Sequence, residues 1–155
     1  MKEIERKFLV KSDDYKKSVV SETRIIQGFL NRDPERTVRV RVKGDDGFIT
    51  VKGLSNDTGT TRFEWEKKIS VAEAEALLPL CEGPVISKIR YEVPIGAHVF
   101  EIDKFSGVNK GLLLAEIELS TEDETFIKPD WLGTEVTGQT KYYNSQLTIK
   151  PFTEW

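Results

Sequence analysis

The sequence predicts an α+β fold in which an eight-stranded antiparallel β-barrel forms a tunnel and short helices pack outside it. Two observations predict this fold. Segments that alternate apolar and charged residues with the period of two that a β-strand requires recur along the chain. About eight strands are predicted, of which only the second, TRIIQGFL, contributes no charge to the polar face. The order of the elements does not fit the regular βαβ repeat of a parallel sheet, so the strands are expected to be antiparallel. Eight such strands are enough to close a small barrel.

The strands are predicted in chain order from this alternation. They cover residues 1–10, 23–30, 37–43, 48–53, 62–69, 86–93, 98–105 and 112–119. In the third strand Val38, Val40 and Val42 occupy one face, and basic residues occupy the other. The sequence GDDG joins this strand to the fourth and is a favourable hairpin turn.

The helices are predicted from their start and stop signals. Ser12 begins a short helix over residues 12–20. Ser70 and Glu73 form a capping box for a helix over residues 71–81, which a Gly-Pro pair ends. Two more helical pieces are predicted in the tail, at residues 121–128 and 140–147, separated by Pro129 and a WLG turn.

Composition restricts the class of protein. The 155 residues are enough to bury a sizeable core, and residues 1–155 are predicted to form one domain. A net charge of -3 argues against a nucleic-acid module. The absence of a signal-peptide core and of any apolar run near the roughly 18 residues of a membrane span predicts a cytoplasmic protein without a membrane partner. Cys81 and His98 are each alone, so both are predicted to be structural rather than part of a disulfide, zinc site or triad.

The second face of the strands is almost purely charged. Its residues are Glu3, Glu5, Lys7, Arg39, Arg41, Lys52, Arg62, Glu64, Glu66, Lys88, Arg90, Glu101, Asp103, Glu116 and Glu118. One interpretation is the solvent face of an open sheet with cross-strand ion pairs. Ordinary solvated strands, however, mix Ser, Thr, Asn and Gln with charges, and the apolar faces need a cover. If the helices and tail cover the outside of a curved sheet, the charged face turns inward.

Stability cannot be the reason for enclosing these charges. Two carboxylates about 5 Å apart repel by roughly 3 kcal/mol at an effective dielectric constant near 20, and desolvation of each ion is also unfavourable. The acidic pairs Glu3/Glu5 and Glu116/Glu118 are understandable if Mg²⁺ or Mn²⁺ binds between them, because both ions prefer oxygen ligands. Basic residues that would suit a bound polyanion are Lys7, Arg39, Arg41, Lys52 and Arg90. A linear triphosphate with bound metal explains both sets.

The charged motifs resemble those of a known family. Glu3, Glu5 and Lys7 form an ExExK motif that is similar to the signature of the CYTH superfamily, also called the triphosphate tunnel metalloenzymes. Further similar motifs follow in the family's order over most of the chain, namely VRVRV at Arg39 and Arg41, VKG at Lys52, FEWE at Glu64 and Glu66, KIRY at Lys88 and Arg90, EID at Glu101 and Asp103, EIE at Glu116 and Glu118, and the tail EVTGQTKYYNSQL. The family fold is an eight-stranded antiparallel tunnel, in agreement with the strand periodicity.

The resemblance implies a metal-dependent enzyme acting on triphosphates, with Mg²⁺ or Mn²⁺ as cofactor. The implied metal-binding acids are Glu3, Glu5, Asp103, Glu116 and Glu118. The implied phosphate-binding residues are Lys7, Arg39, Arg41, Lys52 and Arg90. Glu5 and Lys88 are the implied catalytic residues. Lys88 would position or deprotonate the attacking water, because crowding by Arg90 and Lys52 would lower its pKa; a simple phosphate contact is the other role left open.

Several supporting roles remain open at this point. Glu64 and Glu66 would hold a second metal or orient the basic residues, and the other supporting residues are Arg62 and Glu101. Lys141 is expected to close one tunnel mouth. Phe29 stands where similar bacterial proteins often have the tyrosine of a QGY sequence, so any role of that hydroxyl must be absent or filled otherwise.

The preferred substrate is inorganic tripolyphosphate, hydrolysed to pyrophosphate and phosphate, because nothing in the chain indicates an adenine pocket. A class IV adenylyl cyclase is one alternative, but the His-Phe pair that precedes ExExK in those enzymes has no room beside Met1 and Lys2. Thiamine triphosphatase is another. From a different class, a non-catalytic polyphosphate-binding module would be better served by neutral residues at the acidic pairs. The sequence leaves the oligomeric state open, a homodimer included.

Overall fold

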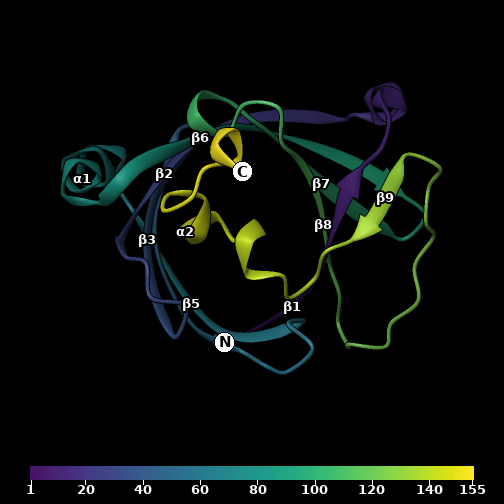
Figure 1. The fold of residues 1–155 in the computed structure, drawn as a ribbon, viewed down its shortest axis with the longest axis horizontal. Coiled ribbons are helices and arrows are strands. Elements are labelled where there is room, and N and C mark those ends of the chain that lie inside the picture. The colour runs from purple at the N-terminus through teal and green to yellow at the C-terminus, as the bar shows by residue number, and fades with distance from the viewer.

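A ring of eight antiparallel strands forms the centre of the computed structural model, which describes residues 1–155. The strands of the ring are β1 (Lys2–Val10), β2 (Ser21–Asn31), β3 (Arg36–Lys43), β4 (Asp46–Ser55), β5 (Thr61–Ile69), β6 (Glu82–Ile95), β7 (His98–Phe105) and β8 (Leu113–Glu118). A ninth strand, β9 (Leu132–Glu135), pairs with β1 beside the ring. Their order is β5-β4-β3-β2-β6-β7-β8-β1-β9, and a further pairing of β5 with β1 closes the ring. The predicted barrel is therefore confirmed (Figure 1).

Strand β1 closes the barrel and has three partners. One edge pairs with β8 along residues 5–9. The opposite edge pairs with β5 at residues 2–4 and then with β9 at Phe8 and Val10. The seam between β1 and β5 is thus only three residues long, and the short strand β9 occupies the remainder of the same edge.

The first predicted helices lie outside the ring. Figure 1 shows α1 (Val71–Leu77) beside the barrel wall, and the predicted capping box is present between Ser70 and Glu73. The helix stops earlier than predicted, because Pro79 lies in a 3₁₀ turn at Leu78–Leu80. Residues Asp13–Ser18 form a 3₁₀ helix, and Ser12 caps it through the Asp14 N–H.

Two predictions for residues 121–133 were wrong. No helix forms over residues 121–128, where the Glu124 carboxylate accepts a hydrogen bond from the Ser120 N–H; such local bonds compete with a helix. The WLG segment, predicted as a turn, instead leads into β9. None of the helices combines the length and apolar character needed to cross a membrane.

The larger apolar core lies outside the barrel wall. It joins the outer faces of β1, β7 and β8 to the covering segments, and its buried residues are Phe8, Tyr15, Val93, Phe100, Ile102, Ala115, Ile117, Leu119, Trp131 and Leu132. Tyr15 and Trp131 come from the 3₁₀ helix and from the loop before β9. This cover over the apolar faces leaves the charged faces directed inward.

The C-terminal tail, defined here as residues 136–155, closes one end of the barrel. Its 3₁₀ helix Thr140–Tyr142 and helix α2 (Asn144–Leu147) lie within the ring of strands in Figure 1, not outside it as predicted. The physical reason is a second apolar cluster on the inner face at this end, formed by Ile86, Phe105, Leu112, Leu114, Val136, Tyr142 and Leu147. The tail buries the apolar end of the inner wall and leaves the charged part free.

The two single residues Cys81 and His98 make structural contacts, as predicted. Cys81 packs so closely on Gly28 that a Cβ atom at Gly28 would lie 2.8 Å from the Cys81 sulfur. His98 forms a hydrogen bond with Glu124, and its ring lies 6.3 Å from the ring of Phe126.

A close glycine contact joins the tail to the turn between β4 and β5. Gly59 has φ +76°, and a Cβ atom there would lie 2.2 Å from the Gly138 Cα. We expect Gly59→Ala to destabilise the protein by about 2 to 4 kcal/mol, from the left-handed backbone and the collision together. Urea unfolding measures this. Gly107→Ala is the matched control, because Gly107 has φ +63° but a Cβ atom there would meet nothing within 4 Å. If both variants lost the same free energy of unfolding, the Gly59–Gly138 contact would make no contribution to stability.

Candidate active site

A charged cavity of about 280 Å³ occupies the barrel. Of the 25 residues that line it, two are hydrophobic. The charged residues on its wall are Glu3, Glu5, Lys7, Arg39, Arg41, Lys43, Lys52, Arg62, Glu64, Glu66, Lys88, Arg90, Glu101, Glu116 and Glu118. Every predicted site residue except Asp103 therefore lines one cavity, and every barrel strand except β2 contributes a charge to it.

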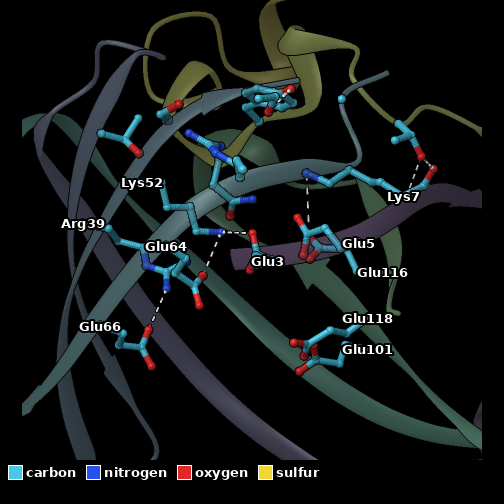
Figure 2. Close-up of a pocket in the computed structure, with 18 of the residues that line it drawn as sticks. Glu3, Glu5, Lys7, Arg39, Lys52, Glu64, Glu66, Glu101, Glu116 and Glu118 are labelled. Carbon is cyan, nitrogen blue, oxygen red and sulfur yellow. Dashed lines mark hydrogen bonds and ion pairs between the residues drawn. The ribbon is translucent and has the colours of Figure 1, made fainter. Parts of the chain in front are cut away.

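The acidic side of the cavity is formed by β1, β7 and β8. The pairing of β1 with β8 sets Glu5 opposite Glu118 and Lys7 opposite Glu116, while Glu101 pairs with Glu116 across β7 and β8. Figure 2 shows two close groups, Glu5 with Glu116 and Glu118 with Glu101. Together with Glu3 on β1, these four side chains place five predicted site acids on one wall of the cavity.

Burial raises the pKa of several of these acids. The pKa of Glu5 lies well above its usual value because burial and the neighbouring charges of Glu116 and Glu3 disfavour its ionised form. Burial would also raise the pKa of Glu116, but Lys7, whose Nζ lies 3.7 Å away, and other cations hold it well below its usual value. A cation bound nearby would therefore stabilise the ionised form of Glu5.

The acidic wall fits a divalent cation such as Mg²⁺ or Mn²⁺. Its donors are carboxylate oxygens, which these hard cations prefer. No three carboxylate, histidine or cysteine side chains form a ready metal cage, and the acids meet in pairs. Pairs are sufficient, because Mg²⁺ is usually bound through one or two carboxylates, with water and substrate phosphates as the other ligands.

The basic side of the cavity is held by acid partners on β5 and β1. Arg39 donates to Thr50 at 3.1 Å and to Glu66 at 3.3 Å. Lys52 donates to Glu3 at 2.8 Å, and its Nζ lies 3.4 Å from Glu64 (Figure 2). These contacts favour the second of the two roles left open for Glu64 and Glu66, the orientation of basic residues.

The arginines of β3 are crowded and only partly satisfied. The Nε atoms of Arg39 and Arg41 are buried without a protein partner. Burial, together with the charges of Arg39 and Arg90, lowers the pKa of Arg41 to about 10. Clustered, desolvated cations with unused donors favour an anion in the cavity, since guanidinium groups bind phosphate oxygens well.

Asp103 lies behind the cavity wall and not on it. Its carboxylate accepts from Lys88 Nζ at 2.7 Å, and it accepts from Arg90 Nε and a terminal nitrogen at 2.8 and 2.9 Å. The side chain is 2% exposed. Both oxygens are therefore occupied by cations, an arrangement that favours the positioning of Lys88 and Arg90 over the expected metal-ligand role of Asp103.

Lys88 has the altered pKa expected from the sequence, but the causes differ in part. Burial first, and the charge of Arg90 second, lower the pKa of Lys88 to about 8, while Asp103 opposes the change. Lys52, which the sequence also suggested, is not among the causes. The amine thus lies within reach of neutrality near physiological pH, as a proton acceptor requires.

The tail also contributes to the cavity, which the strand pattern of the sequence does not show. Tyr143, Asn144 and Ser145 line it, and Asn144 accepts a hydrogen bond from Lys88 at 2.9 Å. The resemblance of the tail to the family was the available signal. Lys141 does not close the mouth; its ammonium lies 4.5 Å from the ring centre of Trp155, on the exposed side. Phe29 does line the cavity, so no hydroxyl is present at that place.

Comparison with known proteins agrees with the motifs. Residues 1–149 match the model of the CYTH domain. A protein of Acetivibrio thermocellus named inorganic triphosphatase is 48% identical over 152 residues, which are 97% of this chain and 96% of that protein. Another of the same name, from Nitrosomonas europaea, is 36% identical over 154 residues, 96% of this chain and 98% of that protein. The crystal structure of the inorganic triphosphatase NE1496 superposes with a TM-score of 0.67 at 34% identity, over 95% of this chain and 94% of that one. The chain therefore belongs to the CYTH domain family.

Proposed function

We propose that this protein is a metal-dependent hydrolase of triphosphate compounds, with inorganic tripolyphosphate as its preferred substrate. The observation that carries the proposal is the cavity in which an acidic wall faces a basic wall, because a triphosphate with a bound cation carries charges complementary to both. The names of the relatives from A. thermocellus and N. europaea support the same substrate class. We place the reaction in the cytoplasm, in a single barrel.

In the proposed reaction, a water oxygen attacks the terminal phosphorus of tripolyphosphate. The bond from that phosphorus to the bridging oxygen breaks, and pyrophosphate and phosphate form with release of the water proton. Arg39, Arg41, Lys52, Arg90 and Lys7 would bind the phosphoryl oxygens and stabilise the charge that spreads over them. Glu3, Glu5, Glu116 and Glu118 would hold the metal. When bound, that ion neutralises phosphate charge and polarises the oxygens that it contacts.

Substrate assays test the proposal. Purified protein is incubated with tripolyphosphate, ATP or thiamine triphosphate, each with Mg²⁺, with Mn²⁺ or with excess EDTA, and the products are identified. We expect the fastest release of phosphate and pyrophosphate from tripolyphosphate, and no release with EDTA. Cyclic AMP as the main product from ATP, or faster turnover of thiamine triphosphate, would replace our proposal by one of its rivals.

Lys88 is proposed to orient the attacking water and accept its proton. Lys88→Arg keeps the positive charge, but its guanidinium cannot act as a base. We expect Lys88→Arg to lower kcat by about 100-fold or more, the usual contribution of a general base. The wild-type rate should rise as pH increases through about 8, since the neutral amine is the active form, and this rise should disappear in the variant. A variant with near wild-type activity, or a wild-type rate that falls through pH 8, would indicate a phosphate contact instead.

A further inference from the structure

Two acceptors from separate parts of the chain hold the Lys88 amine. Asp103 on the neighbouring strand β7 accepts at 2.7 Å, and Asn144 of α2 accepts at 2.9 Å. Lys88 is 2% exposed, but it lines the cavity. Two of the three tetrahedral positions around Nζ are therefore used for fixing the amine, and the third remains for the cavity.

The Asn144 amide has a fixed orientation. Its Oδ1 also accepts from Gln27 Nε2 at 2.8 Å, and Gln27 is fully buried on β2. Because both neighbours present N–H donors, only the oxygen of the Asn144 amide can face them. The chain of contacts Gln27–Asn144–Lys88–Asp103 thus joins three barrel strands, β2, β6 and β7, to the tail.

The tail is anchored without Asn144. Leu147 is fully buried in the apolar cluster at the closed end of the barrel. The Leu147 carbonyl accepts from Asn109 at 3.5 Å, and Gln146 donates to the Arg32 carbonyl at 3.3 Å. A change at Asn144 therefore removes its amide contacts while these anchors remain.

From these contacts we propose that Asn144 is a positioning residue, which holds the Lys88 amine in place for the reaction. This inference rests on the proposed hydrolysis and assigns a part of it to the tail. The barrel strands alone supply one acceptor to Lys88, and the second is present only when the tail closes the end of the barrel. Asn144 acts through Lys88 and Gln27, so its effect should appear in turnover more than in substrate affinity.

Kinetic constants of Asn144 variants on tripolyphosphate test this role. Asn144→Leu has a similar volume but no acceptor, and we expect kcat to fall by about 10- to 100-fold, the range for losing a hydrogen bond to a charged group, with KM nearly unchanged. Asn144→Asp keeps an oxygen acceptor and should retain more of the turnover. Gln146→Leu is the matched control, because it makes the same kind of change two residues later in α2 and should leave kcat unchanged. A fall in kcat equal in Gln146→Leu and Asn144→Leu would assign the effect to tail anchoring and overturn the proposal.

A double-mutant cycle and a substrate-free measurement complete the test. If Asn144 works through Lys88, Asn144→Leu should not lower kcat any further in a Lys88→Met background, since the effects of substitutions within one contact network are not additive. Side-chain ¹H–¹⁵N spectra should show a Lys88 amine resonance, identified by its loss in Lys88→Met, that changes in Asn144→Leu and persists in Gln146→Leu. If Asn144→Leu lowered kcat as much in the Lys88→Met background as in the wild-type protein, the positioning role would be overturned. An unchanged Lys88 amine resonance in Asn144→Leu would overturn it as well. Lack of hydrolysis by the wild-type protein would overturn the proposed function, whereas the resonance would still report the contact.

Discussion

Replacement of Glu5 by glutamine is expected to reduce the hydrolysis of tripolyphosphate by about 100- to 1,000-fold, because a bound metal supplies several kcal/mol of charge stabilisation. Glutamine keeps the shape of the side chain but is a weaker metal ligand. Glu5 is a half-buried acid whose pKa is raised by burial and by Glu116 and Glu3, so its replacement should not destabilise the fold. The variant should still bind tripolyphosphate through the basic wall, and titration calorimetry measures this binding separately from turnover.

Glu22→Gln is the matched control for this experiment. It makes the same chemical change on an exposed position of β2, outside the cavity. Turnover should remain at the wild-type level in the control. Wild-type turnover in Glu5→Gln would exclude the proposed metal role of Glu5. Tighter binding in Glu5→Gln together with an inactive wild-type protein would identify a polyphosphate-binding module instead of an enzyme.

The largest loss of stability is expected for Asp103→Ala. The variant would leave Lys88 and Arg90 buried without their shared acceptor, and removal of one partner from a buried charge pair typically costs about 3 to 5 kcal/mol. The present contacts are short, 2.7 to 2.9 Å, and the Asp103 side chain is 2% exposed. Urea unfolding at neutral pH measures the loss.

A solvent-exposed ion pair provides the control for Asp103→Ala. Asp46 lies 3.0 Å from Lys68, with 51% and 67% of the two side chains exposed. Asp46→Ala should cost less than about 1 kcal/mol, as exposed pairs usually do. If Asp103→Ala were as mild as this control, Asp103 could not be the anchor of Lys88 and Arg90, and a place on the cavity wall would again have to be considered.

The strand pattern was sufficient to predict the barrel and its charged interior. Alternation assigns a side to each residue, and the almost purely charged composition of one side shows that it is not an ordinary wet face. Alternation does not show how far behind the cavity wall a side chain lies, or which residues of neighbouring strands are paired. Asp103 shares its parity with Glu101, but its position between Lys88 and Arg90 depends on the pairing of Arg90 with Asp103 across β6 and β7, which the pattern does not contain.

The closed end of the barrel could have been predicted in part. Ile86, Phe105 and Leu114 share their parity with charged residues of the same strands, so the inner face had to be apolar at one end. An apolar inner end needs a cover, and the tail supplies it. The short turns of the tail are too brief for a period to emerge, so the sequence pattern could not show that Asn144 would face Lys88 and that Lys141 would not enter the cavity.

The position of the tail at one end of the barrel restricts the path by which substrate and products reach and leave the cavity. Because the tail covers one end of the barrel, the proposed substrate and its products would pass through the opposite end, where Glu118 and Lys43 line the cavity.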